Sequence, residues 1–198
     1  MSTRVDPTLL DELKEYGAVS PEACFNCGNC TAICPLTSDD HPFPRNTIRL
    51  LQMGMRNRLL ESPDPWLCYY CGECSETCPR QAEPAETQMA MRRWLTAQYD
   101  WTGLAHRFYT SKFWEVGSVL LLSALVIVVF ALFHGPIVTE QVELNTFAPA
   151  EVVEIGDWIM AATLSLFLLS NIYRMHNFIL RRGFTGPIPL RLYLTEAW

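Results

Sequence analysis

The chain contains the same four-cysteine phrase twice. The first copy, "CFNCGNCTAICP", runs over residues 24–35, and the second, "CYYCGECSETCP", runs over residues 68–79. Both read C-x2-C-x2-C-x3-C-P, a spacing in which three cysteines can bind one iron–sulfur cube and the fourth a neighbouring cube. Structural zinc instead uses C-x2-C pairs separated by a longer gap. The repeat therefore predicts two [4Fe–4S] clusters.

Each phrase is expected to share its ligands between the two clusters. In this spacing the first three cysteines bind one cube, and the fourth reaches the neighbouring cube. Cluster 1 is therefore assigned to Cys24, Cys27, Cys30 and Cys78. Cluster 2 is assigned to Cys68, Cys71, Cys74 and Cys34.

The ends and the charge of the chain limit its location and partners. The N-terminal stretch "MSTRVDPTLLDELKEYG" has no apolar core and no cleavage site, so no secretory signal is expected. The cysteines would then lie in the reducing cytoplasm, which favours metal ligation over disulfides. The net charge of −6 argues against a nucleic-acid partner. No catalytic residue is predicted, because no nucleophile–base pair or phosphate-binding loop is visible.

Apolar spacing predicts an all-α chain. A first helix is expected to start at an Asp6 cap and to stop before Gly17. Further helices are predicted over residues 46–60 and 84–99, and no stretch alternates enough for a strand. Arginines crowd the helix between the phrases, and we expect either a solvated face or a surface that attracts an acidic partner: Arg45, Arg49, Arg56 and Arg58.

Two long apolar runs follow the cysteine-rich part. The first, about 113–133, has about twenty residues, enough to cross a bilayer as a helix. The second, about 155–178, has an apolar centre and polar residues near its end. A buried helix of a soluble protein is the alternative for each run. The predicted domains are an α-helical ferredoxin domain over 1–100, an interfacial linker over 101–112 and a membrane domain over 113–198.

Charges beside the two runs predict their orientation. The connecting loop is acidic: Glu140, Glu143, Glu151, Glu154 and Asp157. The outer flanks are basic: Arg92, Arg93, Arg107 and Lys112 before the runs, and Arg174, Arg181, Arg182 and Arg191 at or after their end. Because basic flanks stay in the cytoplasm, we expect a multi-pass protein of the cytoplasmic membrane with its iron–sulfur domain on the cytoplasmic side.

Four histidines are candidate haem ligands. His134 and His176 close the two runs at opposite ends, so they cannot clamp one haem between adjacent antiparallel spans. Each is either a haem b ligand with a partner from another chain or no ligand at all. His41 and His106 are expected at the surface.

The first part of the chain resembles the all-helical ferredoxin module. More than thirty residues, including a helix, separate the phrases, as in the iron–sulfur subunit of succinate dehydrogenase and in the C subunit of heterodisulfide reductase. The two phrases, the "MRRWLTAQYDW" helix and the runs after "FYTSKFWEVG" together resemble the C subunits of quinone-interacting membrane-bound oxidoreductase complexes over nearly the whole chain. That family has more spans and two b haems. This chain has two spans, so a truncated chain or a split gene is expected.

The resemblance implies electron transfer between the menaquinone pool, through haem b, and cytoplasmic partners in dissimilatory sulfur metabolism. Those partners would be adenylylsulfate reductase and flavin-containing proteins similar to the A subunit of heterodisulfide reductase. One alternative is a catalytic module of heterodisulfide reductase type, which is disfavoured because no cysteine remains beyond the eight assigned. The other is a membrane-tethered ferredoxin without haem.

Overall fold

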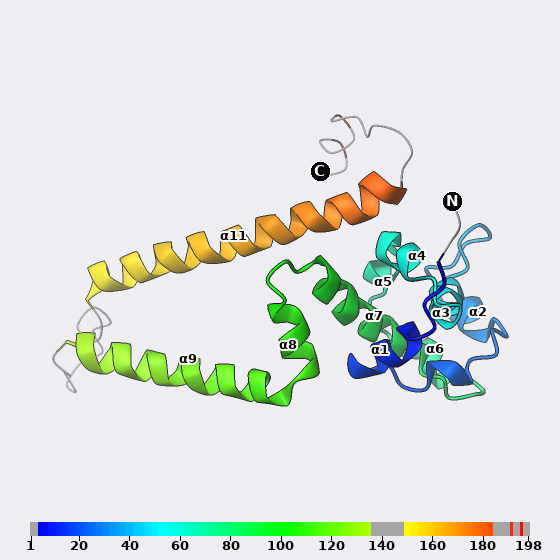
Figure 1. Ribbon diagram of the computed structural model, residues 1–198, viewed down its shortest axis with the longest axis horizontal. Coiled ribbons are helices and arrows are strands. Elements are labelled where there is room, and N and C mark those ends of the chain that lie inside the picture. Colours follow the sequence, from blue (N-terminus) through cyan, green and yellow to red (C-terminus); the bar gives the residue numbers. More distant parts are fainter. Residues whose placement is uncertain (1–3, 136–148, 184–190, 192–194, 196–198) are drawn as a thin grey trace. The chain divides into compact units, whose positions relative to one another are not determined.

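The described part of the chain is built from helices (Figure 1). The computed structural model describes residues 4–135, 149–183, 191 and 195. Among these, one isolated bridge between Ser38 and His41 is the only strand-like pairing, so the predicted all-α class is confirmed. The elements are α1 (Leu9–Glu15), η1 (Pro21–Ala23), α2 (Asn29–Ile33), α3 (Arg45–Gln52), α4 (Arg56–Glu61), α5 (Asp64–Leu67), α6 (Glu73–Glu76), α7 (Pro84–Tyr99), α8 (Leu104–Thr110), α9 (Lys112–Phe133) and α11 (Ala150–Gly183).

The chain divides into two compact units. One comprises Met1–His106 together with Arg174–Trp198, and the other comprises Arg107–Tyr173. All eight cysteines belong to the first unit. The end of α11 belongs to this unit too: the Phe178 ring lies 5.3 Å from the Tyr99 ring, and Ile179 is buried.

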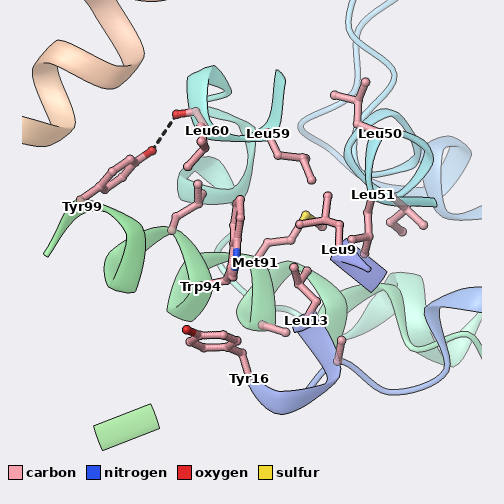
Figure 2. Close-up of a cluster of buried hydrophobic side chains, with 14 residues drawn as sticks. Leu9, Leu13, Tyr16, Leu50, Leu51, Leu59, Leu60, Met91, Trp94 and Tyr99 are labelled. Carbon is pink, nitrogen blue, oxygen red and sulfur yellow. Dashed lines mark hydrogen bonds between the residues drawn. The ribbon is translucent and has the colours of Figure 1, made fainter. Parts of the chain in front are cut away.

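Helix α7 forms the centre of the first unit and coincides with the helix predicted over 84–99. Pro84 is its first residue, where a missing N–H costs nothing. Met91, Trp94 and Leu95 follow the i, i+3, i+4 spacing of one face and are fully buried. Figure 2 shows Met91 and Trp94 packed against side chains of α1, α3 and α4, and Leu95 belongs to the same cluster. Burial of a side chain of this size contributes about 2–3 kcal/mol.

Gly54 breaks the single helix predicted over 46–60 into α3 and α4. Its φ is +65°, and its carbonyl accepts a hydrogen bond of 2.8 Å from the Asp6 backbone N–H. The apolar spacing continues across this break, which explains the wrong prediction. The predicted cap is also wrong by two residues: α1 has Thr8 at its N-cap, and Asp6 Oδ1 accepts from the Thr8 N–H and hydroxyl.

Arg56 ties the N-terminal segment to this break. Its Nε donates to Asp6 Oδ2 over 2.8 Å, and its Nη2 is paired with Glu12. Glu12 also accepts a 2.8 Å hydrogen bond from Trp94 Nε1. Hydrogen bonds from Thr8 and Arg56 lower the pKa of Asp6 to about 2. Of the four arginines for which the sequence left a solvated face or a partner-attracting surface open, Arg56 is therefore paired within the chain.

Two helices in the described part of the chain have the length and composition of membrane spans. Stretches of 18 residues within Lys112–Phe133 and Ala150–Leu180 have mean hydropathies of 2.9 and 1.7, respectively. The apolar side chains of Lys112–Phe133 are exposed, and so are the large apolar side chains of the second helix from Val152 to Tyr173, whereas its end packs within the first unit. The two helices extend beyond the predicted runs by one residue and by several residues, respectively. Glu140 and Glu143 of the predicted acidic loop lie outside the described residues.

Candidate iron–sulfur sites

The eight cysteines line two pockets, four in each. Site 1 contains Cys24, Cys27, Cys30 and Cys78. Site 2 contains Cys34, Cys68, Cys71 and Cys74. Each pocket thus takes three cysteines from one phrase and the fourth from the other phrase. These are the two sets named by the crossed assignment, while cluster binding by each set stays a prediction.

Equivalent short helices position the third cysteine of each phrase. Helix α2 begins after Gly28 and holds Cys30, and α6 begins after Gly72 and holds Cys74. Both glycines have a positive φ, +92° and +88°, which lets the chain turn sharply into the helix. Because α2 and α6 are in contact, Cys30 and Cys74 are buried in one cluster with Ala85. The two sites are therefore neighbours.

Side-chain amides hold the loop of site 1. Gln52 Nε2 donates to the carbonyls of Pro21, over 3.0 Å, and Cys24, over 2.9 Å. Gln52 Oε1 accepts a 2.8 Å bond from Asn26 Nδ2. Two backbone N–H groups also point at sulfurs of this site: Asn26 donates to Cys24 Sγ and Ala82 to Cys78 Sγ, each over 3.4 Å.

Arg92 binds the segment of chain that leads into site 2. Its guanidinium donates to the carbonyls of Pro65, Trp66 and Cys68, with a distance of 2.8 Å to Trp66. A planar guanidinium is suited to this because it presents several donors in a fixed geometry. Arg92 thereby fixes the chain that leads from α5 into the second phrase.

Burial makes three of the thiols poor acids. It raises the pKa of Cys74 to about 12 and also raises the pKa values of Cys30 and Cys34. These side chains become thiolates only beside a compensating positive charge, and coordination to a metal supplies one. Four thiols around one pocket are the donor set of a [4Fe–4S] cube, whose irons each take one thiolate. The residues present fit such a group at both sites.

The two candidate haem ligands, His134 and His176, are not part of a group of metal-binding side chains among the described residues. Within the described ranges, no three His, Cys, Asp or Glu side chains converge closely enough to hold a single metal ion; the thiols of a four-iron cube need not converge in this way, because each binds a different iron. His134 follows the last residue of α9, and its Nδ1 lies 2.9 Å from the Gly135 carbonyl. His176 lies on α11 in the first unit, whereas His134 belongs to the second. The structure does not bring these two histidines together within either unit.

The other two histidines lie in contacts that the sequence does not signal. His41 Nε2 is 3.2 Å from the buried carboxylate of Asp64. His106 Nδ1 is 2.7 Å from the hydroxyl of Tyr16.

Three residues around the sites were missed by the sequence analysis. Gln52 and Arg92 act on backbone carbonyls more than twenty residues away, and no local pattern indicates such contacts. Arg80 lines site 1 and stacks over the exposed Phe25 ring, with 4.2 Å between the guanidinium carbon and the ring centroid. The sequence does carry one signal for Arg80, which is its position two residues after the fourth cysteine of the second phrase. Leu36 holds the equivalent position in the first phrase.

Comparison with known proteins supports an iron–sulfur function for this part of the chain. Residues 20–82 match the family model of the 4Fe-4S dicluster domain. All eight cysteines lie inside the matched range. The chain therefore carries an iron–sulfur domain of the dicluster type, in an all-helical fold.

The similar curated proteins are named as C subunits of heterodisulfide reductases, or as similar to them. A protein of Archaeoglobus profundus, named as similar to the heterodisulfide reductase C subunit, is 36% identical over 98 residues, which cover 49% of this chain and 52% of that protein. The iron-sulfur C subunit of the CoB–CoM heterodisulfide reductase of Methanopyrus kandleri is 32% identical over 111 residues, covering 52% and 57%. The C subunit of the H2:CoB-CoM heterodisulfide, ferredoxin reductase of Methanothermobacter marburgensis is 33% identical over 63 residues, covering 32% and 34%. The matches span between a third and three fifths of these relatives.

Proposed function

We propose that this chain is an electron-transfer subunit of a membrane-bound oxidoreductase and that it holds one [4Fe–4S] cluster in each site. Site 1 would bind its cluster through Cys24, Cys27, Cys30 and Cys78, and site 2 through Cys34, Cys68, Cys71 and Cys74. When bound, such clusters accept and release single electrons. The grouping of eight cysteines into two neighbouring pockets of four is the observation that carries the proposal.

The position of the sites suits exchange of electrons with other proteins. Cys27 and Cys71 are exposed, so each site reaches the surface of its unit. Cys30 and Cys74 are buried together, so the two sites meet inside the unit. A partner at the surface of one site would therefore have access to both clusters through the protein.

Two helices support the membrane part of the proposal. Exposed apolar side chains along Lys112–Phe133 and Ala150–Leu180 would be covered by lipid. The basic residues beside these helices favour a cytoplasmic position for the iron–sulfur domain, with a multi-pass arrangement in the cytoplasmic membrane. We propose domain limits of 1–100 for the ferredoxin part, 101–112 for the linker and 113–198 for the membrane part.

The finer partners are proposed from the family resemblance and from the relatives' names. The relatives are named after heterodisulfide reductases, which supports flavin-containing proteins similar to the A subunit of heterodisulfide reductase as partners. Menaquinone, haem b at His134 or His176 with a ligand from another chain, and adenylylsulfate reductase complete the proposal. Haem staining of the purified chain, alone and with its native neighbours, tests the haem. A chain that never stains and whose clusters quinol never reduces would instead be a tethered ferredoxin.

Iron analysis is the first test of the cluster sites. Full-length protein prepared anaerobically in detergent should contain about eight irons and about eight sulfides per chain, because two cubes are bound. Zinc in place of iron, or a content of about four irons, would contradict the two-cluster proposal.

Replacing the fourth cysteine of each phrase tests the crossed assignment. Cys34→Ser should alter the electron paramagnetic resonance signal of site 2, since Cys34 lies in the pocket of the second phrase. Cys78→Ser is the matched variant and should alter the signal of site 1. Variants of the first three cysteines of each phrase, such as Cys27→Ser and Cys71→Ser, identify which signal belongs to which site. If Cys34→Ser affects the same signal as Cys27→Ser, the crossed assignment is wrong.

A further inference from the structure

The two sites are lined by the same cysteine phrase but by different charges. Site 1 contains Arg80 and no acidic residue. Site 2 contains Glu73 and no basic residue in its lining. These differences occur at equivalent positions of the two phrases, since Asn29 in the first corresponds to Glu73 in the second and Leu36 corresponds to Arg80.

A second arginine adds to the positive charge at site 1. Gly28 lines this site, and a Cβ built on Gly28 would lie 3.1 Å from Arg45 Nη1. The Arg45 guanidinium therefore lies against the loop that carries Cys27 and Cys30. The equivalent Gly72 of site 2 has nothing within 4 Å of such a Cβ.

The charges around site 2 are mixed. Arg92 donates to the Cys68 carbonyl, so one positive charge is close to this site as well. Against it stand Glu73 in the lining and Glu86, which accepts a hydrogen bond from the hydroxyl of Tyr70 in the lining. The charges of Arg93 and Glu83 also act on Tyr70. Two cations and three anions thus make the net charge of these groups negative at site 2, whereas Arg45 and Arg80 add positive charge at site 1.

Hydrogen bonds reach sulfurs at both sites, and one more sulfur is bonded at site 1. Site 1 receives backbone N–H bonds at Cys24 and Cys78, and Thr31 is hydrogen bonded to Cys30. At site 2, Leu36 is hydrogen bonded to Cys34, and the Tyr69 hydroxyl is hydrogen bonded to Cys71. Positive charge and hydrogen bonds to sulfur both stabilise the reduced cluster, which carries one more negative charge than the oxidised cluster.

We propose that the two sites are unequal in reduction potential, and that Arg80 and Arg45 make site 1 the site at which a single electron resides. The inference rests on the proposed function, because it requires a cluster in each site. Reduction of either cluster adds one electron and makes or breaks no bond. An electron delivered to the domain by any one-electron donor would accordingly reduce site 1 before site 2.

A redox titration of the full-length protein in detergent tests this proposal. After iron analysis has shown about eight irons per chain, the reduced signals are followed by electron paramagnetic resonance as the ambient potential is lowered. Two components with different midpoints are expected. Arg80→Glu should lower the reduced-to-oxidised ratio of the higher-potential component about tenfold at fixed potential, about 59 mV for one electron, since two charge units change near the site.

Three further variants separate charge from structure. Arg80→Lys keeps the charge and should leave both midpoints in place, which excludes an effect of lost packing on Phe25. Glu73→Gln should raise the lower midpoint and leave the higher one unchanged. Arg58→Glu changes the net charge as much as Arg80→Glu does, but on α4, which lines neither site, so it should move neither midpoint comparably.

The possible results are distinguishable. A chain with too little iron for two cubes contradicts the proposed function itself. Two loaded clusters with a single shared midpoint would overturn the inference and leave the proposed function in place. The same holds if Arg80→Glu shifts the lower-potential component or neither component. If Arg80→Glu fails to load iron, Arg80→Gln removes the charge alone and must shift the higher component in the same direction.

Discussion

Replacement of Gly54 by Ala should destabilise the iron–sulfur unit far more than the same change at Gly103. Both glycines have left-handed backbone angles, with φ of +65° and +70°. An alanine in this region costs about 1–2 kcal/mol. A Cβ on Gly103 meets nothing within 4 Å, whereas a Cβ on Gly54 would lie 2.2 Å from the Asp6 carbonyl oxygen. Only the Gly54 variant therefore forces a backbone to move.

The size of the difference follows from the contacts of Asp6. Displacing its backbone breaks the 2.8 Å bond from the Asp6 N–H to the Gly54 carbonyl, which contributes about 1 kcal/mol. The displacement also disturbs the partly buried contact between Asp6 and Arg56. We expect Gly54→Ala to lower the free energy of unfolding by about 3 kcal/mol or more, against about 1–2 kcal/mol for Gly103→Ala.

Urea denaturation of the full-length protein, monitored through the near-ultraviolet circular dichroism of the buried aromatics, measures both variants. Asp6→Asn serves as a second comparison, because it removes the charge and leaves the backbone contact intact. Equal midpoints for Gly54→Ala and Gly103→Ala would refute the steric argument. A Gly54→Ala protein as stable as the parent would show that the Asp6 segment does not lie against this turn.

Two other stability effects follow from single buried groups. Burial raises the pKa of Asp64 although His41 lies beside it, so its contribution to stability is present below the unfolded pKa of about 4 and is lost as the pH rises through the folded pKa. Asp64→Asn should therefore raise the urea midpoint at neutral pH, because it removes a buried negative charge. The control Asp40→Asn replaces an exposed carboxylate and should leave the midpoint unchanged. A lower midpoint for Asp64→Asn would mean that the pairing with His41 outweighs the cost of burial. Tyr99→Phe should lower the free energy of unfolding by about 1–2 kcal/mol, because the Leu60 carbonyl loses its 3.0 Å hydrogen bond from the Tyr99 hydroxyl. Thermal unfolding measures this effect, and an unchanged melting temperature would exclude a role for the bond.

Helices were predicted correctly where the sequence carries a start signal and a regular apolar spacing. Pro84 at the first position and the apolar spacing of Met91, Trp94 and Leu95 were sufficient for α7. The same kind of spacing led to the wrong prediction of one continuous helix over residues 46–60. The apolar face continues from α3 to α4, but the helix is interrupted at Gly54. Short helices such as α2 and α6 have too few residues to show a period.

Long-range contacts explain most of what the sequence did not predict. The partners of Arg56 are Asp6 and Glu12, more than forty residues away, so nothing near Arg56 distinguishes it from its exposed neighbour Arg58. The cysteine spacing, in contrast, named the two sets that line the pockets, because the spacing itself determines which side chains face a common centre.

The exchange of one cysteine between the two phrases also bears on how such a chain can be divided. A fragment that ends anywhere between residues 35 and 67 retains three thiols of one pocket and a single thiol of the other. Neither copy of the phrase then supplies a complete set of four thiols by itself. Cleavage of that connection, followed by separation of the two pieces, would leave neither pocket with its four cysteines. The copies are free to diverge in their charges, but each depends on the other's continued presence in the same molecule.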